Sequence, residues 1–159
     1  MMKTLVVGAF VLGLAGFGAL PAVAAPAPAT TVQQQIDDVM VRYPGGVQVS
    51  ETTVSWEDGA ILLTLASPTG RAIGSCATGS YCAFSATNYG GTRLAFTGCS
   101  ATTTSNSLSA LGGTVRSVAN ARTSGTVRAM NGTVIVHALS ANTGITSNAS
   151  SVTALSCTT

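Results

Sequence analysis

Four cysteines constrain the fold of this chain of 159 residues more than any other feature. They are Cys76, Cys82, Cys99 and Cys157, and the sequence offers one histidine, His137, as a further metal ligand. Cys76 and Cys82 lie too far apart for a zinc knuckle, and a single histidine does not complete a zinc site. An even number of cysteines without such partners predicts disulfides, which persist in an oxidising compartment.

The pairing that we expect joins Cys76 to Cys82 and Cys99 to Cys157, although four cysteines also allow other pairings. In the chain-entropy description, a disulfide stabilises a fold more when it closes a longer loop. The estimate is about 4 kcal/mol for the second pair and about 2 kcal/mol for the first. Loss of the Cys99–Cys157 bond is therefore expected to destabilise the protein more.

Residues 1–25 have the features of an export signal. Lys3 supplies the positive start, the run from Leu5 to Leu20 is almost entirely apolar, and Ala22-Val23-Ala24 is a small-residue cleavage pattern. A membrane anchor is the alternative, but no basic cluster follows the run, which is interrupted at Gly13, Gly16, Gly18 and Pro21. We expect this segment to be removed on secretion, leaving a mature extracellular chain with no membrane contact.

Residues 26–70 are expected to form a tether, a short helix and a β-hairpin. The spacing of Val32, Ile36, Val39 and Met40 predicts an amphipathic helix over residues 32–43. The alternation between residues 47 and 65, with a polar turn at residues 57–59, predicts the hairpin. Three possibilities remain open for this segment: a prosegment, a packed subdomain or a free arm.

Residues 71–159 are expected to form the main domain, which reads as all-β. Short runs rich in Val, Thr, Ala and Tyr are separated about every 8–12 residues by Gly, Asn and Ser, as in sandwiches and barrels. Asn131-Gly132 predicts a type I′ hairpin turn, because both residue types tolerate a positive φ. The expected strands are Tyr81–Ser85, Arg93–Thr97, Val115–Ala119, Thr126–Met130, Thr133–Ala138 and Ser151–Leu155.

The acidic side chains all precede residue 59, whereas most arginines follow it. A calcium site and a catalytic pair of carboxylates both need acidic groups, so the C-terminal part of the chain is not expected to provide either. The arginines are dispersed and lack interleaved aromatic residues, which argues against nucleic-acid binding. A solvated surface explains them more simply.

Residues 75–85 and 88–94 resemble the start of the actinobacterial peptidase inhibitor family I36. The resemblance implies a mainly β fold, a βγ-crystallin-like double Greek-key sandwich, here preceded by a short helix and a β-hairpin. Phe84, Tyr89 and Gly91 match the aromatic–aromatic–glycine signature of that fold. Ser117 matches the serine of the strand that is tied back to the hairpin, and Ser151 lies in a fainter second copy.

Two departures from the family pattern limit what the resemblance implies. The positions that correspond to calcium ligands are Gly112-Gly113 and Thr146-Ser147, and Arg116 stands where a Ser or Thr ligand would sit. No metal ion and no other cofactor is therefore expected. The known inhibitor of the family carries its reactive bond on a loop closed by a local disulfide. No cysteine lies between Cys99 and Cys157, so that bond is assigned to no residue here.

We expect a monomeric, non-enzymatic protein that occludes the active site of an extracellular protease with a surface loop. The polar stretch over residues 100–107 is the candidate loop, because its small residues would suit an extended-peptide groove and a disulfide anchors its start. An ordinary surface loop is the alternative. The contact residues proposed are Ser100, Thr102, Thr103, Thr104 and Asn106.

Two other functions remain in view. One is a structural or stress-associated protein of the cell envelope, without inhibitory activity. The other is a hydrolase that uses His137, but a serine triad would need that imidazole to reach a distant aspartate, and no serine lies in a nucleophile-elbow pattern. The aromatic residues suggest a carbohydrate platform less well than they suggest a core, since Phe84 and Tyr89 are already explained by the fold signature.

Overall fold

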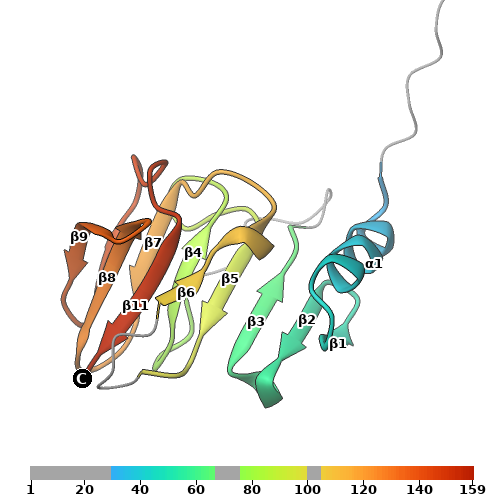
Figure 1. Cartoon of the computed structure of the whole chain (residues 1–159), viewed down its shortest axis with the longest axis horizontal. Helices are drawn as coiled ribbons and strands as arrows, with labels where there is room; N and C mark the ends of the chain where they lie inside the picture. The colour runs from blue at the N-terminus through green and yellow to red at the C-terminus, as the bar shows by residue number, and fades with distance from the viewer. Residues whose placement is uncertain (1–29, 67–75, 100–104) are drawn as a thin grey trace, which may run out of the picture.

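Two antiparallel sheets form the framework of a computed structural model that describes residues 30–66, 76–99 and 105–159 (Figure 1). The expected export signal lies outside the described residues. No helix within them is both long and apolar enough to cross a membrane. The larger sheet has the order β1-β2-β3-β5-β4-β7-β10, and the smaller has the order β6-β11-β8-β9.

The first five strands all belong to the larger sheet, and the later strands are divided between the two sheets. The strands are β1 (Val47–Ser50), β2 (Thr53–Trp56), β3 (Ile61–Thr64), β4 (Tyr81–Phe84), β5 (Arg93–Phe96), β6 (Ser105–Ser107), β7 (Ser117–Asn120), β8 (Thr126–Asn131), β9 (Val134–Leu139), β10 (Thr143–Ile145) and β11 (Ala154–Thr158). Among the described residues, one α-helix, α1 (Val32–Arg42), precedes them, and the two 3₁₀ turns are η1 (Glu57–Gly59) and η2 (Ser109–Leu111). The prediction of a mainly β fold is confirmed.

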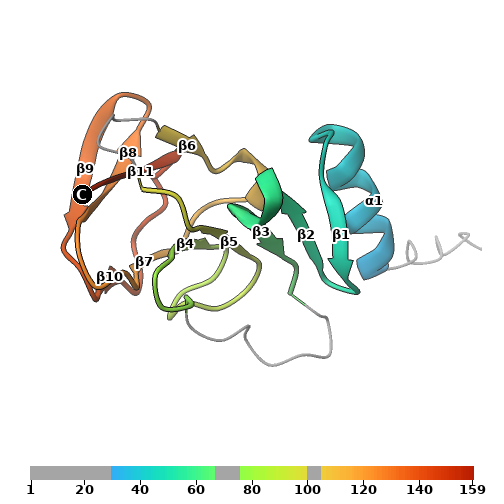
Figure 2. The same cartoon turned by 90° about the horizontal axis from the view of Figure 1, so that it is seen from below.

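The two sheets exchange strands. β6 follows two strands of the larger sheet but pairs with β11 in the smaller one, while β10 follows two strands of the smaller sheet but pairs with β7 in the larger one. The sheets face each other across a shared interior in Figure 2. This exchange fixes how the two sheets lie on each other, because each sheet contains a strand that lies, in chain order, between two strands of the other sheet.

The N-terminal segment, residues 30–66, packs against the rest of the described chain. Thr31 and Gln34 form a capping box that starts α1, which confirms the expected helix. The expected hairpin contains three strands, because residues 51–52 make an additional turn between β1 and β2. β3 then pairs with β5, so the segment shares a sheet with the cysteine-bearing part.

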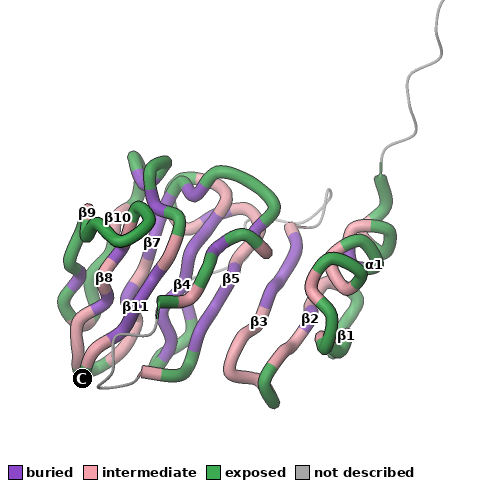
Figure 3. The backbone as a smooth tube through the Cα atoms, in the orientation of Figure 1, coloured by how far each residue is buried: buried purple, intermediate pink, exposed green. Residues whose placement is uncertain are grey.

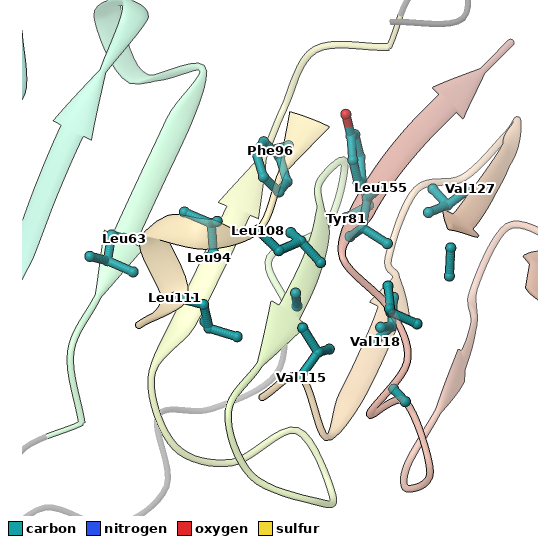
Figure 4. Close-up of a cluster of buried hydrophobic side chains, with 14 of the residues drawn as sticks. Leu63, Tyr81, Leu94, Phe96, Leu108, Leu111, Val115, Val118, Val127 and Leu155 are labelled. Carbon is teal, nitrogen blue, oxygen red and sulfur yellow. The ribbon is translucent and has the colours of Figure 1, made fainter. Parts of the chain in front are cut away.

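One hydrophobic core joins the segment to the rest of the chain. Figure 3 shows buried positions on strands of both sheets, including β3. Ile36 of α1, Val54 and Leu63 are fully buried in the same cluster as the side chains of both sheets. Figure 4 shows Phe96, Leu108, Tyr81 and Leu155 converging between the sheets. Burial of such apolar surface is the main force that holds these layers together.

Three sequence expectations about strand position were wrong. β11 begins at Ala154 rather than at Ser151, because residues 149–152 form a turn in which the Val152 N–H bonds to the Ala149 carbonyl. Val152 is buried in that turn, and an apolar residue at this position resembles part of a strand in the sequence. β7 runs from Ser117 rather than from Val115, and β6 and β10 were not expected as strands at all.

The hairpin turn between β8 and β9 also differs from the expectation. Asn131 pairs with Val134, so Gly132 and Thr133 occupy the two central positions, and of these only Gly132 has a positive φ. The turn is therefore not type I′ at Asn131-Gly132. An irregularity beside Ala129 and Met130 shifts the register of the hairpin, which moves the turn by one residue.

Candidate functional site

Two disulfides form in the cysteine-bearing part of the chain. Cys76 bonds to Cys82 on β4, and Cys99, which follows β5, bonds to Cys157 on β11. These are the pairings expected from the sequence. The second bond links the chain shortly after β5 of the larger sheet to β11, an inner strand of the smaller sheet, so it ties the two layers together.

The aromatic signature forms a folded corner after β4. The rings of Phe84 and Tyr89 are tilted, with centroids 5.6 Å apart. Gly91 has φ +77°, and a Cβ there would collide with the Ser85 hydroxyl. The buried Ser117 hydroxyl donates to the Ala86 carbonyl at 2.7 Å and accepts from the Tyr89 N–H at 3.0 Å.

The structure brings Phe84, Tyr89, Gly91 and Ser117 together, but Ser151 is not their counterpart. Ser151 is exposed in the turn before β11 and lies outside any strand, in contrast to the expectation. Since Phe84 is fully buried, the corner acts in packing rather than as a platform for a ligand.

The two ends of the candidate contact loop are both attached to the same strand, β11. Ser100, Thr102, Thr103 and Thr104 lie outside the described residues. The residue before them, Cys99, is bonded to Cys157, and the residue after them, Ser105, pairs with the adjacent Ser156. Both flanks of residues 100–104 are therefore attached to neighbouring positions on β11. We call residues 99–107 the anchored segment.

Asn106 anchors the end of this segment in the interior. Its side-chain amide donates to the hydroxyl of Tyr81 at 2.7 Å. Tyr81 is 1% exposed, and its ring stacks on Phe96 at 5.3 Å. Burial raises the pKa of Tyr81 above 10.0, opposed in part by the Asn106 hydrogen bond and by the charge of Arg122. Tyr81 is thus a neutral structural anchor at physiological pH.

Arg122 fastens the loops around this anchor. Its guanidinium donates to the carbonyls of Gly79 and Thr97, each at 3.0 Å. These contacts hold the turn before β4 to the chain just after β5, close to where the anchored segment begins. The sequence analysis assigned Arg122 to the surface and missed this role. No local motif reveals it, because its partners are backbone carbonyls distant in sequence.

A groove lies beside the anchored segment and was also missed. It has a volume of about 540 Å³, and an adjoining hollow has about 290 Å³. Both are lined by Glu57, Ile61, Phe96 and Asn106. Trp56 lines the larger one, and its indole N–H donates to the Tyr43 carbonyl at 3.0 Å. Trp56 also packs against the core.

The ionisable groups do not gather into a reactive cluster in the described part of the chain. His137 is exposed on β9, the edge strand of the smaller sheet. The carboxylates lie on α1 and around β1 to β3, at the opposite end of the molecule (Figure 1). Within residues 30–66, 76–99 and 105–159, no three His, Cys, Asp or Glu side chains are placed to hold a metal ion.

The comparisons with known proteins agree with the motif described above. Residues 70–134 match the model of peptidase inhibitor family I36. The matched range contains β4 to β8, the aromatic corner and the anchored segment, and it ends before the β11 strand that carries Cys157. No curated protein and no solved structure matches the chain.

Proposed function

We propose, with the match of residues 70–134 to peptidase inhibitor family I36 as the premise, that this chain is a secreted, non-enzymatic inhibitor of an extracellular protease. The match supports a protease-inhibitor-like role and a protease as the general partner. The two disulfides are compatible with an extracellular site of action. We further infer that the mature protein begins near residue 26, acts as a monomer and has a βγ-crystallin-like fold, which the strand exchange of β6 and β10 supports.

The anchored segment is the part that we assign to the protease contact. The observation that carries this assignment is the attachment of both flanks of residues 100–104 to adjacent residues of β11. A segment held at both ends loses less conformational entropy when it binds than a free loop does. The proposed contact residues are Ser100, Thr102, Thr103, Thr104 and Asn106, and they would occlude the active-site cleft without being cleaved productively.

Titration against a panel of proteases tests this function. The purified mature chain would be added to thermolysin-like metalloproteases and subtilisin-like serine proteases, and residual hydrolysis of a peptide substrate would be measured. We expect one protease class to lose activity in proportion to the inhibitor added, with an end point near equimolar. Flat activity curves across the whole panel would reject inhibition and favour the structural envelope protein.

Matched variants locate the contact. A variant with Thr102, Thr103 and Thr104 all changed to Ala is expected to weaken inhibition. Changing Thr123 and Ser124 to Ala, which are exposed between β7 and β8, is expected to leave it unchanged. His137→Ala is likewise expected to have no effect. A loss of activity with His137→Ala alone would contradict the assignment and point to imidazole chemistry instead.

A further inference from the structure

The groove beside the anchored segment exists because the two sheets differ in width. The larger sheet has seven strands and the smaller has four, so the smaller one covers only part of the larger. α1 packs on the far end of the larger sheet (Figure 2). Between these two covers, Ile61, Leu94 and Phe96 form the floor of the groove of about 540 Å³. One wall of the groove contains Trp56, and the opposite wall contains residues of β6.

Within the described part of the chain, the β6 wall presents a strand edge that has no pairing partner. β6 is the outermost strand of the smaller sheet and pairs on one side with β11. The Leu108 N–H donates to the Thr153 carbonyl on the β11 side, at 3.0 Å. Main-chain groups alternate in direction along a strand, so the N–H and C=O of Ser107 point to the opposite edge. Ser107 itself lines the groove.

The side chain of Asn106 adds amide chemistry to the same wall. Among the described residues, its one hydrogen-bond partner is the Tyr81 hydroxyl. One N–H of the half-buried amide is therefore held, while its oxygen and second N–H have no partner among the described residues, and Asn106 lines the groove. A primary amide that offers a donor and an acceptor matches the C=O and N–H of a peptide bond.

The opposite wall carries charge that would select a partner. Glu57 is exposed and lines both hollows, and Arg42 lines the larger one. No ion pair between them is found among the described residues. A ligand with a basic side chain near Glu57 and a carboxylate near Arg42 would therefore be complementary in charge.

We infer that this groove binds an extended peptide segment of a partner protein, which adds to the free edge of β6 and places a basic side chain against Glu57. Strand addition explains why main-chain groups, an amide side chain and an apolar floor occur together, since edge hydrogen bonds give affinity and floor pockets give side-chain preference. The inference goes beyond the proposed function and shares Asn106 with it, because this proposed contact residue also lines the groove. It does not rest on protease inhibition, since its test records peptide binding directly.

Trp56 provides a direct readout, because it is the one tryptophan in the chain. The probe is a capped peptide of sequence Thr-Val-Lys-Val-Thr-Val, titrated into the mature protein while the indole emission is recorded. A saturable change in emission is expected. The same peptide with alternate amides N-methylated keeps its side chains but loses the edge hydrogen bonds, and it is expected to give no saturable change.

Two variants separate the main-chain and charge contributions. Ser107→Pro removes the edge N–H and is expected to weaken binding roughly three- to tenfold. Ser107→Ala is the matched control, because both changes remove the hydroxyl that contacts Ser109 but only proline removes the N–H. Glu57→Gln is expected to weaken binding of the lysine peptide about two- to fivefold, and to leave a peptide with glutamine in place of lysine unaffected.

Three outcomes would overturn the inference. They are an unchanged Trp56 emission with the unmodified peptide, equal binding of the N-methylated peptide, and an emission change caused only by an N-acetylglucosamine oligomer, which would make the groove a sugar site. The N-methylated comparison uses the unaltered protein, so it decides the question even when Ser107→Pro does not fold. Protease inhibition is measured separately and neither supports nor rejects this site.

Discussion

Two serines that looked alike in the sequence have different surroundings. Ser117 is fully buried, and its hydroxyl joins β7 to the corner after β4 through Ala86 and Tyr89. Ser117→Ala leaves both main-chain partners without that hydroxyl, so we expect a loss of about 1–3 kcal/mol in the free energy of unfolding. Urea unfolding followed by circular dichroism measures this loss.

Ser151→Ala is the control for that measurement. Ser151 is exposed in a turn, so the change is expected to alter the free energy of unfolding by less than about 0.5 kcal/mol. Equal effects of the two substitutions would mean that the Ser117 hydroxyl does not hold the corner. The sequence could not distinguish the two serines, because the difference is that folding brings the main-chain groups of the corner after β4 to the Ser117 hydroxyl.

At the scale of elements, the two disulfides are expected to contribute unequally. Replacing Cys99 and Cys157 with serine opens a loop with a sequence separation of 58, whereas replacing Cys76 and Cys82 opens one of 6. We expect losses of about 4 kcal/mol and about 2 kcal/mol, because loop-closure entropy grows with loop length. Unfolding midpoints in urea compare them. A larger loss from the Cys76–Cys82 change would contradict this order.

Local patterns predicted some elements and could not predict others. α1 was predictable because its apolar spacing is helical and Thr31 and Gln34 cap it. β6 and β10 are only three residues long and consist of Ser-Asn-Ser and Thr-Gly-Ile, without an apolar alternation. They are strands because each crosses to the other sheet and finds a pairing edge there, which is a tertiary effect.

At the scale of the whole molecule, the same distinction applies to the candidate site. The cysteine pairing and the Phe84–Tyr89 corner were accessible from spacing and from the family resemblance. Three features of the site were not predicted: the Tyr81–Asn106 contact, the hydrogen bonds of Arg122 and the groove. They depend on residues that meet only when two sheets of unequal width are packed together. The match over residues 70–134 also stops short of α1 and β11, so it describes a part of the structure whose core extends beyond it.

That shared core predicts cooperative unfolding of the described chain. Ile36 of α1 is 0% exposed and belongs to the cluster that also contains Tyr81 and Leu155. Ile36→Ala is expected to lower the free energy of unfolding by about 2–5 kcal/mol, through lost burial and the cavity left behind. Val41→Ala on the same helix, at a position 85% exposed, is the control and is expected to change it by less than about 0.5 kcal/mol.

A local and a global signal can be compared to show how residues 30–66 unfold. Trp56 emission follows the N-terminal strands, and far-ultraviolet circular dichroism is dominated by the strands of both sheets. In the unaltered protein and in Ile36→Ala, the two signals are expected to change at the same urea concentration, because β3 pairs with β5 and the core is continuous. If the Trp56 signal changed first, the N-terminal segment would be a separately unfolding arm, and the groove that it walls would open before the sandwich does.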